Sequence, residues 1–176
     1  LSALQNIKDL TIQGLECGQR GYFEWLGEEV LRAPPFSDVQ CLSLCFRSLG
    51  VMSDNFDNYH TLHCLYIEDI HFETIPEPIL RLPELIRLEM VSCEISSFPD
   101  TVPCCAECIS VLNLCGNKLR VIPKGLANWK NLEALEFTLN PIMDFANIEC
   151  LLQLANLKTV MLLEGEKSLD MSTLDV

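Results

Sequence analysis

A short apolar pattern recurs along this chain and constrains its fold more than any other feature. The pattern places apolar residues at the first, fourth and sixth of six positions. Its clearest copies are Leu62 to Ile67, Leu85 to Met90, Ile109 to Leu114 and Leu132 to Phe137, and weaker copies begin at Ile7, Val39 and Leu157. Successive first positions lie 32, 23, 23, 24, 23 and 25 residues apart. Copies in such a constant register predict a repeat architecture, in which each unit buries its apolar side against its neighbours.

The spacing within one unit predicts its local structure. The fourth and sixth positions are two residues apart, so both side chains point to the same face of a short strand. A proline follows the apolar stretch in Ile75-Pro76, Phe98-Pro99 and Ile122-Pro123, and proline cannot donate to a strand ladder. Apolar residues then recur every third position, as in Leu126, Trp129 and Leu132. That spacing favours a short helix or 3₁₀ turn that faces the same core.

These copies resemble the L-x-x-L-x-L-x-x-N/C-x-L pattern of the leucine-rich repeat family, mostly its 23-residue intracellular class. The resemblance covers about Leu4 to Gly165. It implies an α/β fold, a leucine-rich repeat solenoid of about seven repeats. A parallel β-sheet would line its concave face, and short helices or 3₁₀ turns its convex face. We expect residues 1–176 to form a single domain that is part of a longer protein, because the first residue is not Met and no capping helix follows Gly165.

Two departures from the pattern predict local irregularities. The ninth position of a repeat usually holds Asn or Cys, whose polar atoms satisfy backbone groups. Here it is Leu15, Arg47, Ile70, Cys93, Asn117, Asn140 and Gly165. We therefore expect the first three turns to be less regular. The first repeat is also longer, and residues 18–35 predict a helix on the outer face, with an apolar stripe of Phe23, Leu26, Val30 and Leu31.

Composition and charge bear on the partners and the compartment. A net charge of −13 speaks against direct nucleic-acid binding and against docking on an anionic membrane. It favours a partner protein with a basic surface; the alternative is that it only keeps an apolar-rich chain soluble. Apolar runs are too short to predict a membrane span. Most of the ten cysteines stand singly in apolar segments, and there is no Asn-x-Ser/Thr sequon. Free thiols without glycosylation acceptors indicate the cytoplasm or the nucleus.

The candidate chemical sites have simpler explanations. Cys105 and Cys108 form a C-x-x-C, but a zinc site usually needs a second such pair, and Cys105 stands at an apolar core position of its repeat. His60, His63, Cys64 and His71 cluster in the sequence, yet adjacent strand residues face opposite ways. No nucleophile elbow or phosphate-binding loop is visible. We expect no enzyme activity, no metal and no cofactor.

The remaining candidate site is the predicted concave face, formed by the variable positions of the strands. Several carboxylates and two aromatic rings gather there, and such a mixture is typical of binding hot spots. The predicted partner-binding residues are Phe46, Tyr66, Glu68, Asp69, Arg87, Glu89, Asn113 and Glu136. The alternative is a solvated sheet face with no partner.

The predicted function is a protein–protein interaction module, the recognition part of a larger intracellular protein. The family offers three versions of this role: a sensor or receptor, a substrate receptor of a ubiquitin ligase, and a phosphatase scaffold. The alternative is a structural subunit that is permanently assembled in a larger complex.

Overall fold

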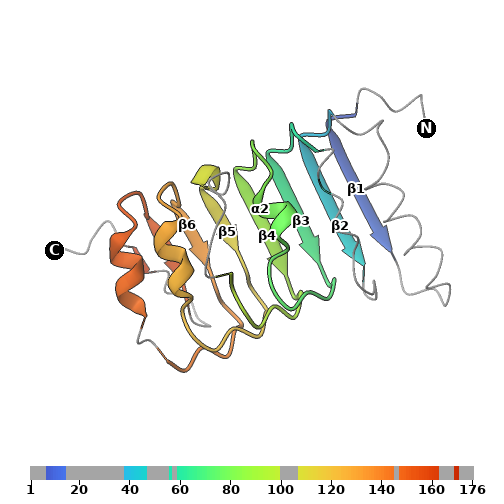
Figure 1. Ribbon diagram of the computed structural model, residues 1–176. Helices are drawn as coiled ribbons and strands as arrows, with labels where there is room; N and C mark the ends of the chain where they lie inside the picture. The colour runs from blue at the N-terminus through green and yellow to red at the C-terminus, as the bar shows by residue number, and fades with distance from the viewer. Residues whose placement is uncertain are drawn as a thin grey trace.

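Seven parallel strands follow one another in chain order and form one open sheet (Figure 1). The computed structural model describes residues 7–14, 38–46, 56, 59–99, 107–144, 147–162 and 169–170. The strands are β1 (Asp9–Gly14), β2 (Cys41–Phe46), β3 (Cys64–Glu68), β4 (Arg87–Val91), β5 (Val111–Asn113), β6 (Ala134–Glu136) and β7 (Thr159–Met161). Each falls on one predicted repeat, so the predicted solenoid is confirmed. The helix predicted over residues 18–35 lies outside the described residues.

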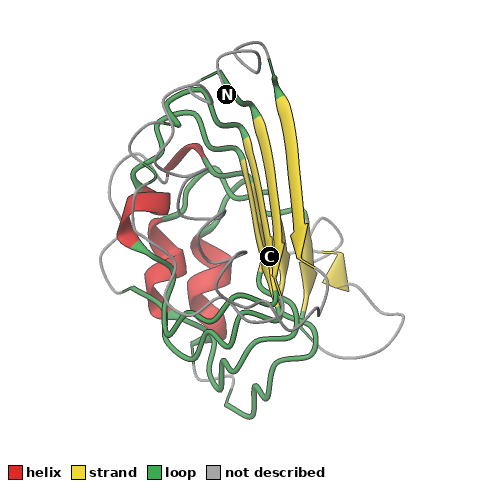
Figure 2. Ribbon diagram, turned by 90° about the vertical axis from the view of Figure 1, so that its right-hand side faces the viewer, coloured by secondary structure: helices red, strands yellow, loops and turns green. Residues whose placement is uncertain are grey.

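Short helices cover the opposite side of the core from the sheet, as Figure 2 shows. They are α2 (Glu77–Leu80), η4 (Lys124–Asn128) and η5 (Ile148–Gln153), the last two being 3₁₀ helices. Extended prolines, Pro76 and Pro123, directly precede α2 and η4, as the proline pattern predicted. None of the helices in the described ranges has the length and apolar character needed to cross a membrane.

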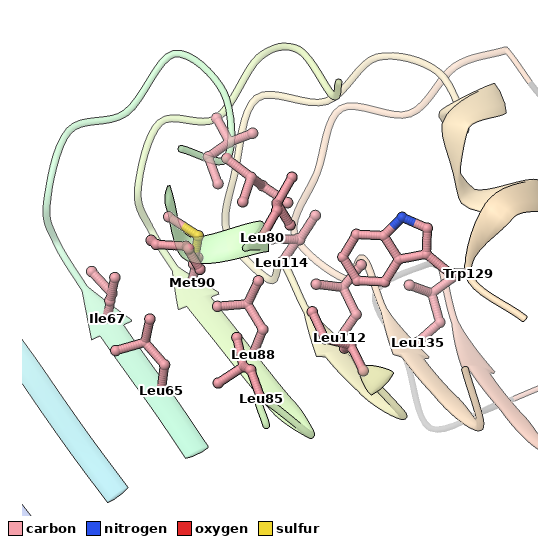
Figure 3. Packing of buried hydrophobic residues seen from close by; sticks show 14 of the residues in the cluster. Leu65, Ile67, Leu80, Leu85, Leu88, Met90, Leu112, Leu114, Trp129 and Leu135 are labelled. Carbon is pink, nitrogen blue, oxygen red and sulfur yellow. The ribbon is translucent and has the colours of Figure 1, made fainter. Parts of the chain in front are cut away.

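The apolar spacing that recurs in each repeat builds one continuous core. Parallel pairing aligns equivalent positions, so Leu65 lies beside Leu88 and Leu88 beside Leu112. These side chains are fully buried, and so are Leu85 and Met90 (Figure 3). Trp129 fills the helical side of the same core (Figure 3). A single repeat could not bury these groups alone, so its stability depends on its neighbours.

A left-handed residue ends the strand segment in four consecutive repeats. Position eight holds Asp69, Ser92, Gly116 and Leu139, with φ values of 59°, 53°, 70° and 57°. The amide of Asp69 still donates to the carbonyl of Val91, and that of Ser92 to Cys115, at 3.1 and 3.0 Å. The left-handed turn therefore keeps the ladder intact while it directs position nine into the core.

Asparagines at position nine, the buried Asn117 and the half-buried Asn140, join neighbouring repeats. Asn117 Oδ1 accepts hydrogen bonds from the amides of Cys93 and Ile95, at 3.1 and 3.0 Å. Its Nδ2 donates to the carbonyls of Met90 and Leu114, at 2.7 and 2.8 Å. Asn140 repeats this arrangement one turn later. The predicted ladder of the fourth to sixth repeats is therefore present.

The first four strands are the longest of the sheet, with six, six, five and five residues against three in β5, β6 and β7. In β5 and β6 the asparagine amides occupy carbonyls that follow the strands, Leu114 and Phe137. The strands that lack a following asparagine are therefore fully formed, whereas the irregularity was expected in the turns of the first three repeats. The turns that follow β1 and β2 lie outside the described residues. At the other end β8 (Leu169–Asp170) pairs antiparallel with β7, so the sheet does not end in an eighth parallel repeat.

Close packing between η4 and the preceding repeat requires glycine at position 125. A Cβ added there would lie 2.5 Å from the carbonyl oxygen of Pro99, which is backbone and cannot move freely. We expect Gly125→Ala to lower the free energy of unfolding by about 2 kcal/mol, although alanine is the better helix former. Urea unfolding followed by circular dichroism measures this, with Lys124→Ala as the control on the same helix. A stabilising Gly125→Ala would contradict the close approach.

Candidate functional site

One row of residues runs across all seven parallel strands on the sheet face that points away from the helices. We call this surface the open sheet face; it is formed by positions three, five and seven of the repeats. The central row is position five, and the strand pairing places its members directly side by side: Thr11, Ser43, Tyr66, Glu89, Asn113, Glu136 and Met161. Neighbouring strands are about 4.8 Å apart, so these side chains contact one another.

Glu89 is the most strongly held carboxylate of the row. Arg87 Nη1 donates to its Oε1 at 2.8 Å, and Asn113 Nδ2 donates to its Oε2 at 3.3 Å. Both oxygens are thus occupied, and the side chain is only 20% exposed, against 50% for Arg87. Asn113 in turn accepts from the Cys115 amide at 2.9 Å. Three of the predicted partner-binding residues, Arg87, Glu89 and Asn113, therefore form one hydrogen-bonded unit.

Glu68 is held by a hydrogen bond from the hydroxyl of Tyr66. The Tyr66 hydroxyl donates to Glu68 Oε2 at 2.8 Å, and the Cys45 thiol lies 3.4 Å from the same oxygen. Burial raises the pKa of Tyr66, and the bond to Glu68 raises it further. The hydroxyl therefore stays protonated at neutral pH and continues to donate.

Glu136 and Asp69 occupy different parts of the surface. Glu136 accepts a hydrogen bond from Thr138 Oγ1 at 2.8 Å. Asp69 is not part of the row, because it is the left-handed residue that ends its strand segment. The backbone of Phe46 ends β2, and its side chain lies outside the described residues. Tyr66 is the one predicted aromatic ring whose place on the surface is known.

The open sheet face is acidic. Within positions three, five and seven of the described strands, the carboxylates are Asp9, Glu68, Glu89 and Glu136, while Arg87 is the one cation. The carboxylates that accept hydrogen bonds from Tyr66, Arg87, Asn113 and Thr138 are held in place by the surface itself. Their positions therefore do not depend on a bound partner.

A hollow of about 190 Å³ opens on this face over β1 to β4. It results from side-chain size: the small Cys41, Ser43 and Cys64 form its floor between larger residues. The surrounding residues are Asp9, Thr11, Tyr66, Arg87 and Glu89, with backbone neighbours Leu10, Leu42 and Leu65. Sequence reasoning named Tyr66, Arg87 and Glu89 and missed Asp9, Cys41, Ser43 and Cys64. The signal available was the run of small residues at positions three and five of consecutive repeats.

The clustered histidines do not converge. His63 Nε2 lies 3.7 Å from Glu84, whereas His71 Nδ1 lies 2.9 Å from Glu94. Within the described ranges, no three His, Cys, Asp or Glu side chains are placed to hold a metal ion. Cys105 lies outside the described residues, and Cys108 is exposed. These positions therefore give no support to a metal centre in the described part of the chain.

The thiols differ sharply in their environment, and this predicts their reactivity. Burial raises the pKa of Cys93 to about 12, and burial followed by hydrogen bonds with Asp9 and Cys64 raises that of Cys41 to about 12. At pH 8 only about one in 10⁴ of either thiol is thiolate, the form that alkylates. Among these three described thiols, we expect iodoacetamide to modify the exposed Cys108 first, with Cys41 and Cys93 roughly a hundredfold slower.

Peptide mass mapping measures these rates, and unfolding in urea is the control that should make all three thiols reactive. Equal rates for Cys93 and Cys108 in the folded protein would contradict the burial of Cys93.

Comparison with known proteins supports the fold and leaves the function open. No protein-family model and no curated protein matches this sequence. Solved structures do. A leucine-rich repeat protein of Leptospira interrogans matches 90% of this chain with a TM-score of 0.65 and 19% identity. Two internalins of Listeria monocytogenes, inlF and C2, match 78% and 77% of it with TM-scores of 0.54 and 0.53 and identities of 18% and 19%.

This chain spans only part of those proteins: 38% of the Leptospira structure, and 45% and 56% of the two internalins. At such low identity the likeness concerns the path of the backbone and no particular site. It agrees with the seven-strand sheet and the helical opposite side described above. The chain therefore has the leucine-rich repeat fold.

Proposed function

We propose that this chain is a protein-interaction module that binds a partner protein on its open sheet face. One observation carries the proposal: Glu68, Glu89 and Glu136 are each held by hydrogen bonds from neighbouring side chains, across four consecutive strands. Side chains that are already ordered lose little conformational freedom on binding, so their contacts contribute more to affinity.

The charge of the face suggests the kind of partner. Four carboxylates against one guanidinium favour a surface rich in Lys and Arg, and attraction of this kind accelerates encounter. It disfavours nucleic acid, whose phosphates would be repelled. The free thiols favour the cytoplasm or the nucleus as the compartment. Roles as a sensor, a ubiquitin-ligase substrate receptor or a phosphatase scaffold all use such a face, and we propose no catalytic role.

The test compares partners captured by the native chain and by a triple variant, Tyr66→Ala/Glu89→Lys/Glu136→Lys. A matched control, Glu77→Lys/Glu149→Lys, makes the same change in net charge on the helical side. Proteins that bind through the open sheet face should bind the triple variant at least about tenfold more weakly, a loss of roughly 1.4 kcal/mol. Their affinity for the control variant should be unchanged. Circular dichroism confirms that both variants fold. An unchanged set of partners would show that this face is not the binding surface.

A further inference from the structure

The hollow over β1 to β4 is a place on the open sheet face where a partner side chain could enter the surface. Its volume is about 190 Å³. An α-helix with its side chains is at least about 10 Å across, so a cavity of this size admits one long side chain and no helix. The hollow exists because Ser43 is small where the next strand carries Tyr66, and because Cys41 and the Cys64 beside it are both small.

The lining of the hollow has a definite electrostatic character. Asp9 and Glu89 contribute negative charge from opposite walls, and Arg87 is already engaged by Glu89 at 2.8 Å. The Cys41 thiol is held protonated and therefore neutral, and so is the Tyr66 hydroxyl. Among the described residues that line the hollow, Arg87 is the one cation, and Glu89 already engages it. The carboxylate of the exposed Asp9 therefore carries the net negative charge of the hollow.

The shape and the charge together select one type of occupant. A long side chain with a positive end can lay its methylene groups over Ser43 and the thiols while its charge reaches Asp9. The face of the Tyr66 ring provides a second attraction for a cation. A carboxylate would be repelled by Asp9 and Glu89, and a short apolar side chain would desolvate Asp9 without supplying a cation.

From these observations we propose that the hollow binds a single basic side chain, an arginine or a lysine, of the partner protein. This inference rests on the proposed function, since it assigns the anchor of the same interface. It makes Asp9, Ser43 and Tyr66 the residues that determine specificity, whereas Glu136 contributes to the general charge of the face.

The test begins with peptides selected from a random display library on the native 176-residue chain. The selected peptides are expected to share an arginine or lysine at a common position. Replacing it with citrulline, or with acetyl-lysine, keeps the shape and removes the charge, and should weaken binding about tenfold or more. Asp9→Asn removes the negative charge of the hollow, and Ser43→Leu fills the hollow. Each variant should weaken binding of the basic peptide to the level measured for the citrulline or acetyl-lysine peptide.

Matched controls away from the hollow are Glu149→Gln and Ser96→Leu, which should leave binding unchanged. Two results would overturn this inference and leave the proposed function standing. One is a citrulline peptide whose affinity lies within about twofold of the arginine peptide. The other is binding that Asp9→Asn and Ser43→Leu both leave intact while Tyr66→Ala/Glu89→Lys/Glu136→Lys abolishes it. Peptides insensitive to the triple variant as well, or no selected binder, would contradict the proposed function together with the inference.

Discussion

Replacing Trp129 with alanine is expected to lower the free energy of unfolding by about 4 kcal/mol. Trp129 is fully buried and is among the largest buried side chains of the core. Its ring centroid lies 5.6 Å from that of Phe98, so it joins the helical side of two successive repeats. Alanine would leave a cavity at this junction, and a solenoid depends on such contacts between neighbours. Urea unfolding followed by circular dichroism measures the change.

Trp129→Phe separates the role of the ring from that of its N–H group. Trp129 Nε1 is buried without a hydrogen-bond partner among the described residues, so phenylalanine removes a desolvated donor as well as some apolar area. We expect this variant to cost about 1 kcal/mol. A Trp129→Phe variant as unstable as Trp129→Ala would contradict the account, because it would mean that the N–H group contributes most of the stability.

Asn117→Ala is the second large effect, expected at about 3 kcal/mol. The side chain is 4% exposed and makes hydrogen bonds to the amides of Cys93 and Ile95 and to the carbonyl of Met90. Alanine would leave these three backbone groups buried without this partner. No apolar contact that alanine could make offsets that loss.

A second asparagine provides the control for this prediction. Asn131 also joins two repeats, through Nδ2 to the carbonyl of Glu107 at 2.7 Å, but it is exposed. Water can replace that bond, so Asn131→Ala should cost less than about 1 kcal/mol. Measured by the same urea titration, equal losses for the two variants would show that burial is not what makes the ladder important.

Much of the fold could be predicted because the repeats share one pattern, so the structure inferred for one repeat applies to the others. The spacing of Leu65 and Ile67 predicts a strand, and the recurrence of that spacing in Leu88 and Met90 predicts its neighbour and its register. Asn117 and Asn140 could be assigned to the ladder, because a polar residue that recurs inside an apolar pattern needs buried partners. These inferences use local patterns and simple periodicity.

Other features depend on side chains that meet only after folding. The hollow requires Ser43 to lie beside Tyr66 and Cys41 beside Cys64; the repeat register places these residues side by side but does not give the side-chain conformations that leave the space open. The left-handed conformations of Ser92 and Leu139 were not predicted either, because neither residue is glycine. They follow from the need to direct Cys93 and Asn140 inward. Tertiary packing there overrides the local preference of the backbone.

The candidate site was predicted in outline. Tyr66, Glu89, Asn113 and Glu136 do form one row, as the repeat register requires. The pairing of Arg87 and Asn113 with the two oxygens of Glu89 was not foreseen, since it depends on side-chain conformations. This pairing changes the interpretation of the surface. It makes Glu89 an ordered acceptor within a network, whereas an isolated carboxylate would only be a solvated charge.

Site-specific photocross-linking tests the central claim most directly, because it reports which face the partner touches. A benzoylphenylalanine introduced at Val91, next to Glu68 on the open sheet face, should form a covalent adduct with the captured partner. The same group at Lys124, exposed in η4 on the helical side, should form none and serves as the negative control. Adducts from position 124 and none from position 91 would contradict binding through the open sheet face.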